Sequence, residues 1–104
     1  MPDIKAYELK TRLDHGEQVL LIDVREPYEH DEFNIGGDNL PLPEIMAWSD
    51  ELNVPADTEI ILYCRTGNRS EMARSVLLSK GFSGARNLLG GIVAWKEMLS
   101  KQDY

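Results

Sequence analysis

The chain has 104 residues, enough for one domain with a hydrophobic core and too few for two. Hydrophobic residues make up 42% and charged residues 28%, as in an ordinary soluble globular protein, and no apolar run approaches the roughly 20 residues of a membrane span. The net charge of −7 argues against nucleic acid, whose binding depends on Lys and Arg neutralising phosphates. We therefore expect a single domain over residues 1–104, with its core at about 4–99, and neither nucleic acid nor a membrane as partner.

The expected compartment is the cytoplasm. Residues 1–5 lack the basic and apolar regions of a signal peptide. The only cysteine, Cys64, cannot form an internal disulfide, which favours a reducing environment.

The first half of the chain alternates helical and apolar segments. A helix is predicted from Asp3, as its N-cap, to about residue 14, with Leu9 and Leu13 on one face and Gly16 at its end. Residues 19–24 form an apolar run, interrupted only by Asp23 and without polar alternation, which is typical of a strand covered on both faces. The following segments are predicted as a short acidic helix (27–33), a turn (36–37), an edge strand (40–42) and a helix (43–52).

The second half repeats this alternation. A strand is predicted over 60–63, a helix over 70–80 with Gly81 as its cap, a strand over 85–88 and a helix over 92–99. Strands alternating with helices indicate a small three-layer α/β fold, with a parallel sheet and helices on both faces. Ligands of such folds bind at the carboxyl ends of the strands. Cys64 directly follows one predicted strand, and the segment 23–25 closes the earlier one.

Cys64 begins the sequence Cys-Arg-Thr-Gly-Asn-Arg-Ser, between a predicted strand and a predicted helix. Backbone N–H groups of a tight turn can surround an anion, and Gly67 tolerates the positive φ that such a turn needs. The helix N-terminus adds partial positive charge, and Arg65 and Arg69 add full charges. These effects favour the thiolate, which is the nucleophilic form of cysteine. The alternative, an inert core cysteine, fits poorly with so polar a continuation.

Three segments resemble the signatures of single-domain rhodaneses. They are Asp-Val-Arg at 23–25, Tyr-Cys-Arg-Thr-Gly-Asn-Arg-Ser at 63–70 and Leu-Leu-Gly-Gly-Ile-Val-Ala-Trp at 88–95, and their order and spacing agree with that family. The resemblance implies a rhodanese-like fold and a thiosulfate sulfurtransferase. Cys64 would take sulfane sulfur from a small anionic donor, hold it as a persulfide and pass it to cyanide or a thiol, which could be a protein thiol. It implies no metal and no organic cofactor.

The same resemblance suggests roles for individual residues. Cys64 is the expected catalytic nucleophile, and Arg65 and Arg69 are the expected anion clamp. Thr66 and Asn68 could donate hydrogen bonds to a bound sulfur oxyanion, or could simply be solvated. The expected substrate-binding residues are therefore those of the loop: Arg65, Thr66, Gly67, Asn68 and Arg69.

Further residues near the predicted site have supporting or structural interpretations. Asp23 and Arg25 could orient the loop or contact the donor, although an ion pair at a strand end explains them equally well; Ser70 is a further supporting residue. His15 is interpreted as a capping or surface residue and His30 as solvent-exposed, and neither has the spacing of a metal site. In the family that the chain resembles, a histidine often stands where this chain has Asn34; the difference removes a histidine base there and leaves substrate preference open, but is not interpreted as loss of activity.

Two other functions use a cysteine in a similar loop. Cysteine-dependent phosphatases and arsenate reductases place an arginine six positions after the cysteine, where this chain has Ser70, with Arg69 one position earlier. The spacing therefore argues against oxyanion chemistry of that kind. A sulfur carrier or regulatory module that acts only with a partner protein would have the same sequence, so this alternative stays open.

Overall fold

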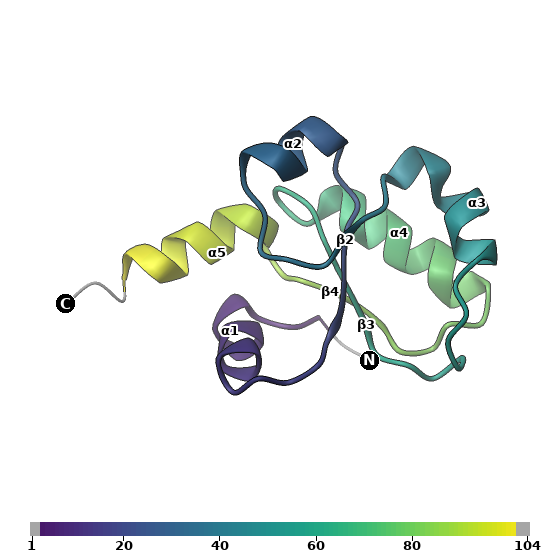
Figure 1. The fold of residues 1–104 in the computed structure, drawn as a ribbon, viewed down its shortest axis with the longest axis horizontal. Helices are drawn as coiled ribbons and strands as arrows, with labels where there is room; N and C mark the ends of the chain where they lie inside the picture. The colour runs from purple at the N-terminus through teal and green to yellow at the C-terminus, as the bar shows by residue number, and fades with distance from the viewer. Residues whose placement is uncertain (1–2, 102–104) are drawn as a thin grey trace.

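The computed structural model describes residues 3–101, which form a four-stranded parallel sheet with helices on both faces (Figure 1). The strands lie in the order β2-β1-β3-β4. Their bounds are Leu20–Asp23 for β1, Asp38–Asn39 for β2, Ile60–Tyr63 for β3 and Ala85–Asn87 for β4. The helices are α1 (Ala6–Asp14), α2 (Pro27–Glu32), the 3₁₀ turn η1 (Leu42–Glu44), α3 (Ile45–Asp50), α4 (Asn68–Ser79) and α5 (Gly91–Ser100). The predicted α/β architecture is confirmed.

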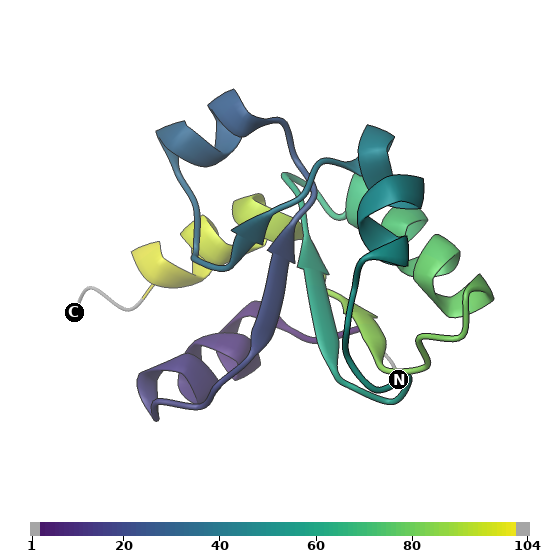
Figure 2. The same ribbon diagram turned by 45° about the vertical axis from the view of Figure 1, so that its right-hand side comes forward.

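Successive side chains of the central strands point to opposite faces and divide the core in two. Ile22 and Leu62 belong to a cluster with α3 and α4, whereas Leu21 and Ile61 pack with α1 and α5. Figure 2 shows α1 and α5 on one side of the sheet and α3 and α4 on the other. Because both faces are covered, these strands are apolar at successive positions rather than at alternate ones, apart from Asp23 at the end of β1.

The carboxyl ends of β1 and β3 lie side by side, with Asp23 opposite Tyr63 in the parallel register. Cys64 follows β3 directly, and the segment 23–25 closes β1. Helix α2 lies beyond these strand ends (Figure 2). The two segments singled out in the sequence therefore meet at one edge of the sheet.

The first helix begins later than predicted. Its N-cap is Lys5, not Asp3, and no side chain caps it. The reason is that Ile4 forms a parallel bridge with Leu88, and the Ile4 N–H donates to the Asn87 carbonyl at 3.0 Å. This pairing holds the start of the chain extended against the sheet, so the helix cannot begin before it.

The edge strand is also displaced from its predicted position at 40–42, because β2 is Asp38–Asn39. Leu40 still donates to the Asp23 carbonyl at 2.9 Å, and Leu42 to the Val24 carbonyl at 3.0 Å. Pro41 lies between them and has no N–H. The regular ladder therefore stops, and the chain enters η1 and α3 where one helix over 43–52 was predicted.

An ion-pair network around Glu59 joins three parts of the fold. Glu59 accepts hydrogen bonds from Arg12 of α1 at 2.5 and 2.9 Å and from Arg86 of β4 at 2.7 Å. The Arg12 guanidinium lowers the pKa of Glu59 to about 2, and Arg86 contributes in the same direction. The carboxylate therefore stabilises the folded state more than the unfolded one.

Glu59→Gln should lower the free energy of unfolding by about 1–2 kcal/mol at neutral pH. The Glu59 pKa is depressed in the folded state, so its contribution is present above the ordinary pKa of 4.5 and is lost as the pH falls toward 2. Urea unfolding of wild type and Glu59→Gln between about pH 7 and pH 3 measures the difference in their free energies of unfolding, which should shrink as the pH falls. A gap between them that does not narrow at acidic pH would contradict the assignment.

Candidate active site

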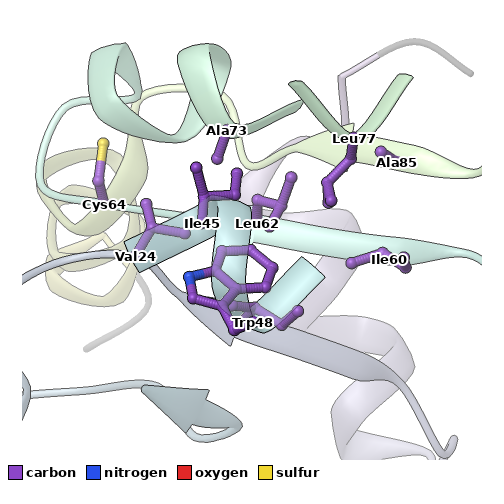
Figure 3. Packing of buried hydrophobic residues seen from close by; sticks show 10 residues of the cluster. Val24, Ile45, Trp48, Ile60, Leu62, Cys64, Ala73, Leu77 and Ala85 are labelled. Carbon is purple, nitrogen blue, oxygen red and sulfur yellow. The ribbon is translucent and has the colours of Figure 1, made fainter. Parts of the chain in front are cut away.

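Cys64 lies directly after β3 with its sulfur enclosed by the following loop. The residue is 1% exposed, and Sγ accepts hydrogen bonds from the N–H groups of Gly67 at 3.1 Å and Ser70 at 3.4 Å. Gly67 has φ +102° and is the N-cap of α4. Helix α4 thus begins at Asn68, two residues earlier than predicted. Figure 3 shows Cys64 beside Val24, with its sulfur pointing away from the core cluster.

The carbonyl groups of the loop are held by the last helix. The N–H of Ile92 donates to the Cys64 carbonyl at 2.9 Å, and that of Val93 to the Arg65 carbonyl at 3.0 Å. Gly91 permits this approach: a Cβ there would lie 2.3 Å from the Cys64 carbonyl oxygen, and its φ is +55°. The start of the loop is therefore fixed against α5.

Gly91→Ala should therefore destabilise the protein by about 2–4 kcal/mol, because the new methyl group overlaps backbone atoms of the loop. Gly81→Ala is the matched control. Gly81 also has positive φ, at +97°, but a Cβ there has nothing within 4 Å, so only the conformational cost of about 1 kcal/mol applies. Equal losses for the two variants in urea unfolding would show that the close approach at Gly91 does not matter.

Ser70 connects the sulfur to a residue that the sequence analysis missed. Its Oγ lies 3.3 Å from Cys64 Sγ and donates to Asn87 Oδ1 at 2.5 Å. Asn87 Nδ2 in turn donates to the Gly67 carbonyl at 3.1 Å. Only its position along the chain could have identified Asn87 as a site residue: it ends β4, the strand next to β3, and so lies at the same edge of the sheet as Cys64.

The pair Asp23–Arg25 is buried at the end of β1. Arg25 donates to Asp23 at 2.8 to 3.2 Å and to the Phe33 carbonyl at 2.6 Å. His30 Nδ1 lies 2.9 Å from Asp23 Oδ2, and the His30 side chain is only 20% exposed. The expectation of a solvent-exposed His30 is therefore wrong, because α2 folds back over the strand end and brings His30 against Asp23.

The two loop arginines differ in their surroundings. Arg69 forms a bidentate ion pair with Glu29 of α2, at 2.8 and 2.9 Å, whereas Arg65 is exposed. The Arg69 guanidinium lowers the pKa of Glu29 to about 2. Thr66 and Asn68 are exposed at the loop tip. The expected clamp thus consists of one exposed arginine and one whose charge a carboxylate balances.

A pocket of about 400 Å³ opens beside the loop. Arg65 and Lys96 bring positive charge to its wall, and Lys96 Nζ lies 4.5 Å from the centre of the Phe33 ring. The lining residues are Arg25, Tyr28, Glu29, Glu32, Phe33, Arg65, Ile92 and Lys96. The site therefore combines a buried sulfur with an adjoining opening of mixed charge and partly apolar walls.

Glu29→Gln should make Cys64 more reactive toward anions. The substitution frees the charge of Arg69, while the Gln side chain can still accept the Glu26 N–H at the start of α2, as Glu29 does at 3.0 Å. The measurement is the ratio of alkylation rates with iodoacetate and with neutral iodoacetamide. We expect this ratio to rise about threefold, the scale of a partly exposed ion pair.

Glu32→Gln is the control, because Glu32 also lines the pocket and carries the same charge. The same rise in both variants would mean that the ratio reports overall charge rather than the pairing of Arg69.

The remaining predicted residues lie apart from the sulfur. Asn34 is exposed and bonds within its own turn, with Nδ2 donating to the His30 carbonyl at 3.0 Å and Oδ1 accepting from Gly36 at 2.9 Å. His15 is exposed, as predicted, with Nδ1 2.7 Å from the Thr11 carbonyl. Within residues 3–101, no three His, Cys, Asp or Glu side chains gather as metal ligands, and no helix is long and apolar enough to cross a membrane.

The fold and the cysteine loop agree with the comparison against protein families. The model of the rhodanese-like domain matches residues 5–98, nearly the whole chain. The protein therefore belongs to the rhodanese-like domain family. The resemblance inferred from the three sequence segments is confirmed.

Curated relatives differ in how much of their length this chain covers, from a quarter to most of it. The chain is 43% identical over 98 residues to a Mycobacterium tuberculosis "Probable adenylyltransferase/sulfurtransferase MoeZ", covering 92% of this chain but only 25% of that protein. It is 38% identical over 93 residues to a "Sulfurtransferase" of Allochromatium vinosum, covering 89% and 86%. It is 33% identical over 96 residues to a "Putative sulfur carrier protein YrkF" of Bacillus subtilis, covering 91% and 51%.

Among solved structures, the chain is similar to the human single-domain sulfurtransferase TSTD1. The TM-score is 0.77 with 27% sequence identity, over 93% of this chain and 96% of that one. The fold is thus found as a stand-alone domain as well as within longer proteins.

Proposed function

We propose that this protein transfers sulfane sulfur from thiosulfate, or a similar small anion, to a thiophilic acceptor through a persulfide on Cys64. The observation that carries the proposal is the sulfur of Cys64 at a strand end, with the N–H groups of Gly67 and Ser70 directed at it. These donors favour negative charge on the sulfur and so support a nucleophilic thiolate.

In the first half-reaction, the Cys64 thiolate attacks the outer sulfur of thiosulfate. A new S–S bond forms, the S–S bond of the donor breaks, and sulfite leaves with the electron pair. Arg65, exposed at the pocket wall, is placed to attract the anionic donor. Arg69 can contribute once an incoming anion competes with Glu29 for its guanidinium.

In the second half-reaction, the acceptor attacks the outer sulfur of the persulfide. Cyanide would leave as thiocyanate, and a thiolate would leave as a new persulfide; in both cases the Cys64 thiolate is regenerated. The pocket beside Arg65 is much larger than thiosulfate needs, so a thiol carried on a larger molecule, including a protein, is also a suitable acceptor. No metal or organic cofactor takes part, and we place this chemistry in the cytoplasm.

A second candidate function is that of a sulfur carrier, which receives sulfur only from a partner protein. Its support is the similarity to the Bacillus subtilis protein with that name and to a mycobacterial protein of which this chain spans a quarter. Both candidates use the same Cys64 persulfide. They differ in whether thiosulfate alone can load it.

The deciding measurement is the intact mass of the protein after incubation with thiosulfate. We expect wild type to gain one sulfur atom, which cyanide removes with the formation of thiocyanate. Cys64→Ser should gain none and should lose turnover by at least about a thousandfold, because no other residue supplies the nucleophile.

A wild type that gains no sulfur from thiosulfate would overturn the enzyme proposal. If the same protein gains sulfur on Cys64 when a cysteine desulfurase is added, the carrier function is the correct one.

A further inference from the structure

The Ser70 hydroxyl has one proton and two acceptors within reach. Its Oγ lies 3.3 Å from Cys64 Sγ and 2.5 Å from Asn87 Oδ1. A hydroxyl group donates one hydrogen bond. The sulfur and the amide oxygen therefore compete for the same proton whenever Cys64 is a thiolate.

A second contact fixes the orientation of the Asn87 amide. Nδ2 donates to the Gly67 carbonyl at 3.1 Å, so a flipped amide would press Oδ1 against that carbonyl. Oδ1 thus faces Ser70, and since it carries no proton, the 2.5 Å contact requires the proton of Ser70. Ser70 and Asn87 are 0% and 5% exposed, so water does not readily replace a lost partner.

We propose that Asn87 is a positioning residue for Cys64: it retains the Ser70 proton and leaves the thiolate to the backbone N–H groups of Gly67 and Ser70. A thiolate with fewer donors is less populated but more nucleophilic, because intrinsic nucleophilicity falls as a thiol becomes more acidic. Asn87 therefore lowers the fraction of Cys64 that is thiolate and raises the nucleophilicity of each thiolate that forms. This inference concerns the nucleophile of the proposed function.

The same charged groups surround the loop in every variant used to test this. They are Arg65 and Arg69 on the loop, Glu29 paired with Arg69 from α2, the Asp23–Arg25 pair with His30 at the end of β1, and Lys96 on α5. Differences between the variants therefore report the Ser70 proton rather than these charges.

The test is the pH dependence of Cys64 alkylation by iodoacetamide in Asn87→Ala. The freed Ser70 hydroxyl can then donate to the thiolate. The pH midpoint should fall by about one unit, as expected for a hydrogen bond to a charged acceptor. The limiting rate at high pH should fall about threefold, following the dependence of thiolate nucleophilicity on acidity.

The control is the same substitution in a Ser70→Ala background, where neither quantity should change. Ser70→Ala alone should leave the midpoint almost unchanged, because Ser70 does not donate to the thiolate while Asn87 retains its proton. This variant tests the proposal if Asn87→Ala does not fold: a rise of about one unit would mean that Ser70 already donates to the sulfur, and would overturn the proposal. An upward shift for Asn87→Ala in both backgrounds would mean that Asn87 merely braces the loop, and would overturn the proposal.

Alkylation measures the thiolate whether or not the protein transfers sulfur. If thiosulfate loads Cys64 normally but Asn87→Ala shows no Ser70-dependent shift, only the role of Asn87 is wrong. If the shift appears and thiosulfate never loads Cys64, only the proposed function is wrong.

Discussion

The cysteine loop takes its shape from the hydrogen bonds that α5 makes to its carbonyl groups. Ile92 and Val93, in the first turn of α5, bond the carbonyls of Cys64 and Arg65. A helix N-terminus has N–H groups without partners inside the helix, and these loop carbonyls supply them. These bonds fix the first two peptides of the loop against α5, and the chain then turns back through Gly67, so that the N–H groups of Gly67 and Ser70 reach the sulfur. The N-termini of α4 and α5 thus both bond to the segment after β3: α5 to the loop carbonyls and α4 to the sulfur.

Charge around this loop is balanced locally. The protein carries a net charge of −7, yet its site adjoins several arginines. Arg25 is paired with Asp23 inside the fold and Arg69 with Glu29 at the pocket, while Arg65 is exposed. A small anion that approaches the loop is therefore attracted by a limited positive charge within a negatively charged protein. The carboxylate of Glu29 reduces that charge by pairing with Arg69. Beside the sulfur, a pair of uncharged side chains acts as well: the Ser70 hydroxyl donates to Asn87 Oδ1, which competes with the sulfur for its proton.

The central strands and the cysteine loop were predictable from the local sequence. The strand over 60–63 was predicted with its observed bounds, because continuous apolar residues fit a strand covered on both faces. The loop was recognisable because cysteine, glycine and two arginines follow that strand directly. The predicted bounds were wrong where pairing with distant segments sets them. The bridge from Ile4 to Leu88 makes α1 begin later than predicted, and the ladder beside β1 ends at Pro41.

The sequence by itself determined the fold class and the family and singled out Cys64 as the candidate nucleophile, because these depend on residue type, periodicity and spacing within short segments. Only the tertiary structure decided the partners of each polar side chain. Arg69 meets Glu29 from 40 positions away, and Ser70 meets Asn87 from 17 positions away. His30, which looks like a surface residue among acidic neighbours, is brought against Asp23. Such pairings follow from strand order and helix placement, and no local pattern along the chain encodes them.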